Sequence, residues 1–346
     1  MKGAVFLGDR TVALRDFPDP EPGPGDVVVA IRASGMCGSD LHTYRDQPGG
    51  ETTSGRCIGG HEPAGVVHAV GAGVSPEIAS PGDRVMVHHY AGCTRCDACR
   101  SGWPQMCTTA PTRVFGAHEH GAHAPFMRVP AATLVPLHPS LTFEAGAAIA
   151  CGTGTAWGGL ERLGDVGGAA IAVFGQGPVG LSATMLATAR GARVIAVDPE
   201  PARRSHAERL GAVATIDPAH VSASKAVRDL TDGEGAQSVL ETSGATAAAS
   251  EGLSALAPWG TMCVVGLGGE VRFRVFDFYR SQMTLRTSWS MSIVQQRQCA
   301  EFIARNTLPI DDLFSHRWQL DHVVEAYEEF DRQDAGKGVI LFNDES

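Results

Sequence analysis

The pattern of apolar and polar residues divides the chain into two parts of different character. In the first part, short β-type runs such as residues 26–31 and 83–87 lie between closely spaced prolines and glycines. Short strands interrupted by proline and glycine are typical of an irregular, mostly β domain with long loops. The pattern therefore predicts such a domain for the N-terminal part of the chain.

A second pattern begins near Cys151. Residues 169–174 are continuously apolar, as in a strand that is buried on both faces of a parallel sheet. The segments that follow alternate between helical and strand-like patterns, and two helices and a strand are expected at the end. Alternating strands and helices predict a parallel sheet with crossover helices. Besides the first strand, we expect a helix at 179–190 and strands at 192–197, 238–241, 262–266 and 338–342.

Composition restricts the class of protein. With 346 residues, of which 43% are hydrophobic and 19% charged, the chain is long enough for two domains with their own cores. Its net charge of −10 opposes binding to nucleic acid, and the sequence shows no basic patch. No apolar run reaches the roughly 18 residues of a membrane helix, and the N-terminus does not resemble a signal peptide. We therefore expect no nucleic acid or membrane partner, and a cytoplasmic location.

A glycine-rich turn follows the strand predicted at 169–174 and precedes a helix. With this spacing, the first glycine permits the tight turn, the second lets the backbone approach a pyrophosphate and the third packs helix on strand. The helix N-terminus then faces the negative charge. The pattern predicts a dinucleotide site, with a turn that binds no nucleotide as the alternative. The turn consists of Gly175, Gln176, Gly177, Pro178, Val179 and Gly180.

Asp198 indicates which dinucleotide is bound. It ends the next predicted strand, where a carboxylate accepts hydrogen bonds from both ribose hydroxyls. Because a carboxylate repels a 2′-phosphate, NAD is favoured over NADP. Arg203, which we count among the coenzyme-binding residues, and Arg204 leave NADP as the less favoured alternative.

Four cysteines with the spacing C-x2-C-x2-C-x7-C lie within one short segment. Short C-x2-C steps allow successive thiolates to bind one ion, and four sulfurs complete a tetrahedral shell. Such a site has no open position, so it stabilises a loop and does not catalyse a reaction. Similar spacings also hold iron–sulfur clusters, and free buried thiols are a third alternative. The four residues are Cys93, Cys96, Cys99 and Cys107.

More widely separated residues are candidates for a second metal site. Cys37, His61 and Cys151 are of the types that bind zinc, and three protein ligands leave a fourth position for water or substrate. An open position would make the site catalytic. Taken singly, each residue also has an ordinary structural role, because a lone cysteine is commonly a small core residue and a lone histidine bonds locally.

Together, the motifs resemble those of the zinc-dependent alcohol dehydrogenases of the medium-chain dehydrogenase/reductase (MDR) family. The resemblance covers essentially the whole chain and rests on Cys37-Gly-Ser-Asp, Gly60-His-Glu, the four cysteines and the glycine-rich turn. It implies an α/β protein with a GroES-like, mostly β catalytic domain and a Rossmann coenzyme domain built on a doubly wound parallel sheet. The catalytic domain would comprise residues 1–152 and 291–346, and the coenzyme domain residues 153–290.

The resemblance also implies the metal ligands. Cys37, His61 and Cys151 match the ligands of a catalytic zinc, and the four clustered cysteines match those of a structural zinc. One ion of each kind per chain is therefore expected.

The resemblance implies further roles near the catalytic zinc. Ser39 and His42 match the hydroxyl and the histidine of a proton relay. Glu62 matches the acidic neighbour of the ligand histidine, which can approach the metal during ligand exchange. Lys337 resembles the basic residue that helps to hold the coenzyme pyrophosphate.

The implied activity is the transfer of a hydride from an alcohol, with a secondary alcohol or polyol expected, to NAD, giving a ketone or aldehyde. A sugar-alcohol or amino-alcohol dehydrogenase of the same family is an alternative, because the ligands do not determine the substrate. A non-catalytic protein that binds zinc and nucleotide is a second alternative, and the presence of Ser39 and His42 argues against it. We expect a small-molecule alcohol or carbonyl partner and a homodimer or homotetramer, with residues 264–275 as a candidate interface. No role is assigned to His118, Glu119 and His120.

Overall fold

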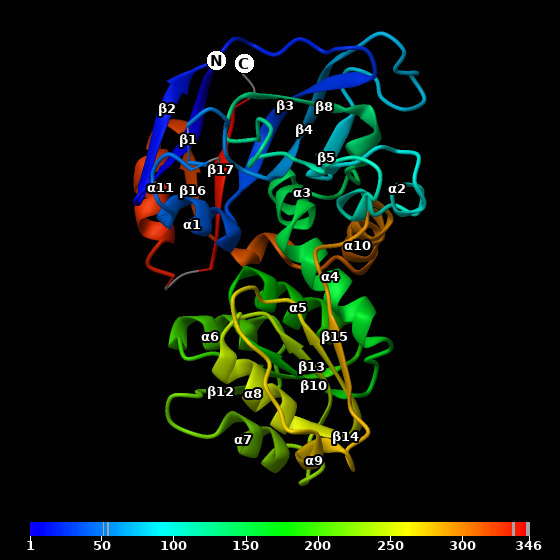
Figure 1. Ribbon diagram of the computed structural model, residues 1–346, viewed down its shortest axis with the longest axis vertical. Coiled ribbons are helices and arrows are strands. Elements are labelled where there is room, and N and C mark those ends of the chain that lie inside the picture. The colour runs from blue at the N-terminus through cyan, green and yellow to red at the C-terminus, as the bar shows by residue number, and fades with distance from the viewer. Residues whose placement is uncertain (51, 54, 334–335, 344–346) are drawn as a thin grey trace. The chain divides into compact units, whose positions relative to one another are not determined.

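The computed structural model describes residues 1–50, 52–53, 55–333 and 336–343, and the chain forms two compact units (Figure 1). The first unit is built from Met1–Gly152, Ser292–Gln333 and the chain from Lys337 onward. The second is built around Thr153–Met291. The first unit is therefore assembled from both ends of the sequence, and the second is inserted between them.

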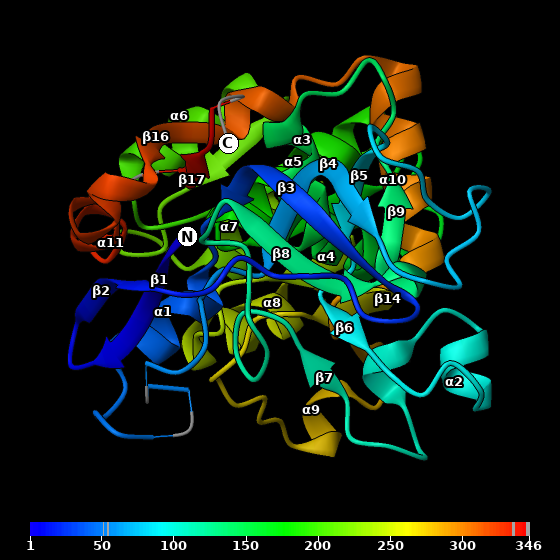
Figure 2. The same ribbon diagram turned by 90° about the horizontal axis from the view of Figure 1, so that it is seen from above.

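A seven-stranded sheet forms the centre of the first unit, in the order β16-β17-β3-β4-β5-β9, with β8 paired to β3. Figure 2 shows β3 between β4 and β8, and both pairs are antiparallel. Two small sheets, β1-β2 and β6-β7, accompany it. The strands are β1 (Lys2–Gly8), β2 (Thr11–Asp16), β3 (Asp26–Gly35), β4 (Glu62–Val70), β5 (Arg84–Val87), β6 (Tyr90–Ala91), β7 (Arg113–Val114), β8 (Phe126–Pro130), β9 (Leu134–Pro136), β16 (Phe314–Gln319) and β17 (Lys337–Leu341).

Helices cover this sheet at two places. α3 packs on β3 and β4, and α10 packs against α3. At the second place, apolar residues of α1 and α11 form one buried cluster with residues of β1 and β17. The helices are α1 (Gly38–Arg45), α2 (Asp97–Arg100), α3 (Phe143–Ala150), α10 (Ile293–Asn306) and α11 (Val323–Phe330), with 3-10 turns at η1 (Pro104–Met106), η2 (Ala131–Thr133), η3 (Ile310–Leu313) and η4 (Leu320–His322).

The second unit is a six-stranded parallel sheet in the order β12-β11-β10-β13-β14-β15. Numbered from β10, this is the 3-2-1-4-5-6 order of a doubly wound dinucleotide-binding fold. The strand order reverses between β10 and β13, and ligands of such sheets bind beyond the carboxyl ends of the strands at this point. The strands are β10 (Ala170–Phe174), β11 (Arg193–Val197), β12 (Ala214–Ile216), β13 (Ala236–Glu241), β14 (Leu256–Val264) and β15 (Thr284–Thr287).

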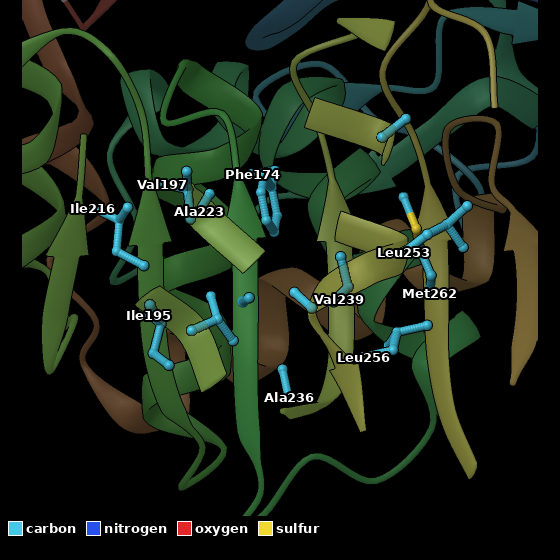
Figure 3. Close-up of a cluster of buried hydrophobic side chains, with 14 residues drawn as sticks. Phe174, Ile195, Val197, Ile216, Ala223, Ala236, Val239, Leu253, Leu256 and Met262 are labelled. Carbon is cyan, nitrogen blue, oxygen red and sulfur yellow. The ribbon is translucent and has the colours of Figure 1, made fainter. Parts of the chain in front are cut away.

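One face of this parallel sheet is covered by α7 and α8. Figure 3 shows Phe174, Val197 and Val239 on neighbouring strands, and Leu253 of α8 belongs to the same buried cluster. α5 packs on β10 and β11 and contacts α6. The helices of this unit are α4 (Gly152–Leu163), α5 (Pro178–Ala189), α6 (Pro201–Arg209), α7 (Ala223–Asp229), α8 (Thr246–Ala255) and α9 (Val275–Phe278).

The predicted fold class is confirmed, but details of the second sheet differ from the prediction, and β12 was not among the predicted strands. β14 begins at Leu256, earlier than the expected 262, although Pro258 and Gly260 interrupt its pattern. β15 forms the edge of the sheet next to β14. This strand was not predicted, because its sequence TLRT has no apolar run. The expected interface segment, 264–275, lies mostly in the connection that precedes α9. In the described part of the chain, none of the helices combines the length and the apolar character needed to cross a membrane.

Candidate metal centres and coenzyme site

Four potential ligands converge in the first unit, and we call them the Cys37 cluster: Cys37, His61, Glu62 and Cys151. Their ligand atoms all lie within 4.8 Å of one another. Cys37 is the N-cap of α1, Cys151 is the C-cap of α3, and His61 directly precedes β4. Each ligand therefore stands where a regular element starts or stops, and the sheet and its helices bring together residues that are far apart in the sequence.

Asp40 orients the histidine of this cluster. Its carboxylate Oδ1 lies 2.9 Å from His61 Nδ1, and its Oδ2 accepts the backbone N–H of Cys37 at 2.9 Å. The second contact is half of a capping box at the start of α1. With Nδ1 bonded to Asp40, His61 presents Nε2 as its ligand atom, as carboxylate–histidine pairs do at metal sites. No role was predicted for Asp40, although Cys37-x-x-Asp40 has the spacing of a capping box at a helix start.

The thiols of the cluster are prepared for metal binding. The hydrogen bond from Cys151 lowers the pKa of Cys37 well below its usual range, aided by His61 and Lys337 and opposed by burial. The same hydrogen bond raises the pKa of Cys151 well above its usual range. Burial lowers the pKa of His61, but the Asp40 carboxylate outweighs it and the net pKa is raised. These shifts favour the thiolate at Cys37 and the thiol at Cys151, and binding of a metal would release the remaining protons.

Within the cluster, Glu62 forms an ion pair with Lys337, and both side chains are fully buried. The Lys337 ammonium also donates to the Met36 carbonyl at 3.1 Å, and Glu62 Oε1 accepts the Gly152 N–H at 3.2 Å. Gly35 faces Glu62 across β3 and β4, where an added Cβ would overlap the carboxylate. The resemblance assigned Lys337 to the coenzyme pyrophosphate. The structure gives its ammonium partners in the first unit, so the pyrophosphate role remains a prediction.

The two relay candidates differ in their surroundings. The Ser39 hydroxyl lies 3.3 Å from Cys37 Sγ and 3.2 Å from His61 Nε2, so it reaches the ligands directly. His42 lies one turn further along α1 and is exposed. No hydrogen bond joins it to Ser39 within the described ranges. The structure therefore brings Ser39, but not His42, to the metal ligands.

The four cysteines of the short segment also meet, and we call their segment the four-cysteine lobe (Cys93, Cys96, Cys99 and Cys107). Their sulfurs lie within 4.8 Å of one another. The backbone N–H groups of Arg95 and Cys96 point to Cys93 Sγ at 3.4 and 3.3 Å. Hydrogen bonds from backbone N–H groups, first that of Thr109, lower the pKa of Cys107 to about 5. The contacts of Cys107 favour its thiolate, which is the form that binds metal, whereas burial raises the pKa of Cys99 to about 12.

The Cys37 cluster and the four-cysteine lobe each have a geometry that fits one zinc ion. Zn–S bonds of about 2.3 Å in a tetrahedron place two sulfurs roughly 3.8 Å apart. The observed separations are 3.9 Å for Cys93–Cys99 and for Cys96–Cys107, and 4.0 Å for Cys37–Cys151. A cluster of several irons would hold some of its cysteines farther apart, since cysteine sulfurs then bind different irons. The geometry of the lobe therefore favours one ion over the iron–sulfur alternative.

In the second unit, each glycine of the glycine-rich turn occupies a position where a side chain would be strained, would overlap other atoms or would restrict access to the backbone. Gly175 has φ +87°, which few other residues adopt. No atom lies within 4 Å of a Cβ added at Gly177, so the backbone there is open to a ligand. A Cβ on Gly180 would overlap the Gly175 carbonyl, so α5 requires glycine to approach β10. Pro178 and the half-buried Val179 are the first two residues of α5, so the helix N-terminus begins directly after the open backbone at Gly177.

Asp198 is fixed beside this turn. Its Oδ2 accepts the Gln176 N–H at 2.6 Å and its Oδ1 accepts the Glu200 N–H at 2.8 Å. Arg204 is engaged with the Asp198 carbonyl and with Asp217. Arg203 lies in the first turn of α6 and is half-buried, and its Nε has no hydrogen-bond partner among the described residues. The residues present therefore fit an adenine ribose next to a pyrophosphate, with Arg203 as the candidate for a 2′-phosphate, because Arg204 is already engaged.

The remaining histidines separate into two groups. His118 and His120 are exposed, and neither they nor Glu119 belong to the Cys37 cluster. His89, by contrast, is buried, with its ring centroid 5.0 Å from that of His61. His123 is buried beside Gly60, and its hydrogen bonds are described below. A pattern in a single sequence does not distinguish these histidines, because their burial depends on which strands pack together.

Comparison with known proteins agrees with this geometry. The family model described as alcohol dehydrogenase GroES-like domain matches residues 23–139, and that described as zinc-binding dehydrogenase matches residues 178–305. The zinc-type alcohol dehydrogenase-like protein YphC of Escherichia coli (strain K12) is 35% identical over 358 residues, which cover 99% of both chains. The chain belongs to the zinc-dependent alcohol dehydrogenases of the MDR family.

Two further relatives indicate the range of this family. The dehydrogenase is 33% identical to the L-threonine 3-dehydrogenase of Pyrococcus furiosus, over 93% of this chain and 92% of the relative. The solved structure of alcohol dehydrogenase TADH from Thermus sp. ATN1 superposes with a TM-score of 0.90 at 30% identity, covering 99% of this chain and 100% of that one. The dehydrogenase is thus a zinc-type oxidoreductase of the alcohol and polyol dehydrogenase family.

Proposed function

We propose that this dehydrogenase oxidises a secondary alcohol or polyol to a carbonyl compound with NAD as hydride acceptor. Cys37, His61 and Cys151 would hold a catalytic zinc, and the four-cysteine lobe a structural zinc. The observation that carries the proposal is the Ser39 hydroxyl, 3.2 Å from His61 Nε2 and 3.3 Å from Cys37 Sγ. A site that only binds metal needs no such hydroxyl beside its ligands.

Zinc bound to the Cys37 cluster would supply polarisation of the substrate oxygen. The residues around it hold the ligands and move a proton. Ser39 Oγ accepts the hydroxyl proton of the alcohol and passes its own proton on toward solvent, where the exposed His42 can receive it. The substrate carbon loses a hydride to NAD, so the products are a carbonyl compound, NADH and one proton.

NAD is supported by the surroundings of Asp198. A carboxylate at the end of β11, fixed by the backbone of Gln176 and Glu200, repels a 2′-phosphate and accepts hydrogen bonds from ribose hydroxyls. NADP is the alternative, with Arg203 as the residue that would bind its extra phosphate. Comparing kcat/KM for the two coenzymes distinguishes them, and a clear preference for NADP would contradict the assignment.

The substrate class rests on the family. The L-threonine 3-dehydrogenase of P. furiosus is named for oxidation at carbon 3 of threonine, which carries a secondary hydroxyl. Secondary alcohols are therefore the first compounds to screen, followed by sugar alcohols and amino alcohols. Formation of reduced coenzyme with any of these compounds supports the proposal. If the protein holds zinc and NAD but oxidises none of them, it is the non-catalytic alternative.

Replacement of Ser39 by alanine is expected to lower kcat by about 10²–10⁴-fold, the contribution of a positioned proton-transfer group. Zinc content should not change, because Ser39 is exposed and is not one of the candidate ligands. The measurements are steady-state turnover and metal analysis on the same preparation. Ser39→Thr, which keeps a hydroxyl, is the matched control and should retain more activity than the alanine variant. Equal turnover of Ser39→Ala and wild type would eliminate the relay assignment.

We also propose that the dehydrogenase is a homodimer, or a homotetramer containing such dimers, joined at the outer edge of the parallel sheet. All four residues of the edge strand β15 are exposed, and Val275 and Phe276 nearby are 72% and 81% exposed. An uncovered strand edge flanked by apolar residues is a typical site for pairing with a second chain. Light scattering of the purified protein tests this expectation, and a monomer would contradict it.

A further inference from the structure

A buried carboxylate connects two ligands of the Cys37 cluster. Asp40 is 4% exposed, and its two oxygens bond to His61 Nδ1 and to the Cys37 backbone N–H, each at 2.9 Å. Rotation of this carboxylate would therefore move the ring of one ligand and the backbone of another. What holds Asp40 in place determines how accurately the cluster is formed.

A third group reaches Asp40 from the C-terminal part of the chain. The hydroxyl of Tyr327, in α11, donates to Asp40 Oδ2 at 3.3 Å, although the two residues are 287 positions apart. The same hydroxyl lies 2.7 Å from His123 Nε2. His123 Nδ1, in turn, lies 2.8 Å from the hydroxyl of Ser34 in β3. Five buried or half-buried side chains thus form one continuous series, Ser34, His123, Tyr327, Asp40 and His61.

Donor and acceptor properties give this series a direction. An ionised carboxylate only accepts hydrogen bonds, so Tyr327 donates to Asp40 and its oxygen is left to accept from His123 Nε2–H. The neutral imidazole then accepts at Nδ1 from the Ser34 hydroxyl. Burial lowers the pKa of His123 to about 4, so the ring is neutral near pH 7 as this arrangement requires. Every donor in the series has an acceptor.

The two central rings are fixed by packing. Tyr327 is fully buried, with ring centroids 5.0 Å from Phe6 and 5.5 Å from Tyr44 (α11 and α1 are shown in Figure 1). The His123 ring lies against Gly60, where an added Cβ would overlap it. Gly60 has φ +83° and directly precedes His61, so His123 also packs against the backbone that carries the ligand. Neither ring can turn away without disturbing its neighbours.

We propose that Tyr327 and His123 are positioning residues for the metal of the Cys37 cluster, acting through Asp40 on His61 and Cys37. The proposal rests on the zinc site proposed above. Groups that orient metal ligands in this way typically change metal affinity by about 10–100-fold. Since neither residue touches the four-cysteine lobe, metal bound there should be unaffected.

The test is the rate at which the zinc-loaded protein releases metal to a chromogenic chelator. Cys151→Ala identifies which part of the release belongs to the Cys37 cluster. Tyr327→Phe keeps the ring but removes the donor, and it should release this metal about tenfold faster or more. The control is Tyr44→Phe, because Tyr44 is a neighbouring buried tyrosine that takes no part in the series. Its release rate should equal that of wild type.

A double variant separates positioning from simple stability. In Tyr327→Phe alone, His123 Nε2 loses its partner and the protein should be less stable. In His123→Phe/Tyr327→Phe, both polar partners are replaced by apolar rings, so much of the stability should return. Metal release should remain fast, because Asp40 still lacks its third donor. The proposal is overturned if release is unchanged in Tyr327→Phe, or if the double variant recovers stability and metal retention together. If wild type itself holds no metal at the Cys37 cluster, the zinc-site assignment fails first and this proposal fails with it.

Discussion

Alanine at Cys151 is expected to reduce the metal content from two ions per chain to one and to lower turnover by at least about 10³-fold. Cys151 supplies one of the two sulfurs of the Cys37 cluster, 4.0 Å from the other. Without it, two strong ligands remain, His61 and Cys37, and these do not retain zinc well. Metal-ion polarisation supplies several kcal/mol of transition-state stabilisation, and each 1.4 kcal/mol or so is a factor of ten in rate.

The measurement is zinc per chain by elemental analysis, with turnover determined on the same samples. Cys263→Ala is the matched control, because Cys263 is a buried cysteine of β14 and belongs to neither metal group. It should keep both ions. Two ions in Cys151→Ala would show that this residue is not a required ligand. One ion in wild type, retained in Cys151→Ala, would confine the metal to the four-cysteine lobe.

Replacement of Lys337 by methionine is expected to lower the free energy of unfolding by about 3–5 kcal/mol, the usual effect of leaving one member of a buried ion pair alone. Lys337 and Glu62 are fully buried against each other, so the carboxylate would lose its counter-charge inside the protein. Adding Glu62→Gln to the same chain removes the isolated charge, and we expect the double variant to recover most of the loss.

The loss should depend on pH. Burial, only partly offset by Lys337, raises the pKa of Glu62 to about 7 from its ordinary value of 4.5. A folded-state pKa above the unfolded one means that the folded protein holds more protons between these values, so stability decreases as pH rises from 4.5 to about 7. Without Lys337, the pKa rises further and the variant should be most destabilised at alkaline pH.

Urea unfolding at pH 5 and pH 8 measures this dependence. Lys225→Met is the matched control, because Lys225 pairs with Asp229 on the surface, where the side chains are 75% and 63% exposed. Exposed pairs contribute about 0–1 kcal/mol, so this variant should unfold nearly like wild type at both pH values. A Lys337→Met protein as stable as this control would mean that the buried pair contributes nothing to the fold.

The fold could be predicted from local patterns because its strongest signals are local. A continuous apolar strand followed by a glycine-rich turn predicted β10 and α5, and closely spaced cysteines predicted the four-cysteine lobe. The edge strand β15 was missed because TLRT carries no apolar alternation. Its position is set by pairing with β14, which a single-sequence pattern does not contain.

The Cys37 cluster needed the family resemblance, because Cys37 and Cys151 are 114 residues apart and no spacing connects them. The residues that hold the ligands were harder to find. Tyr327 and His123 are 204 residues apart in the sequence, although their side chains are hydrogen-bonded. Taken singly, each looks like an ordinary buried core residue in the sequence. Lys337 was predicted to help hold the coenzyme pyrophosphate. Its ion pair with Glu62 could not be predicted, because it depends on the pairing of β3, β4 and β17 in one sheet.

The insertion of the second unit into the first also sets the order of assembly during protein synthesis. β17 pairs with β3 in the middle of the seven-stranded sheet, yet the whole parallel-sheet unit separates them along the chain. During translation, the whole second unit is therefore synthesised, and can fold, before β17 of the first unit is made. Cys37 and Cys151 are exposed to the cell as nascent thiols during this interval, before Tyr327 and Lys337 exist. The Cys37 cluster can thus gain its contacts with Tyr327 and Lys337 only near the end of translation.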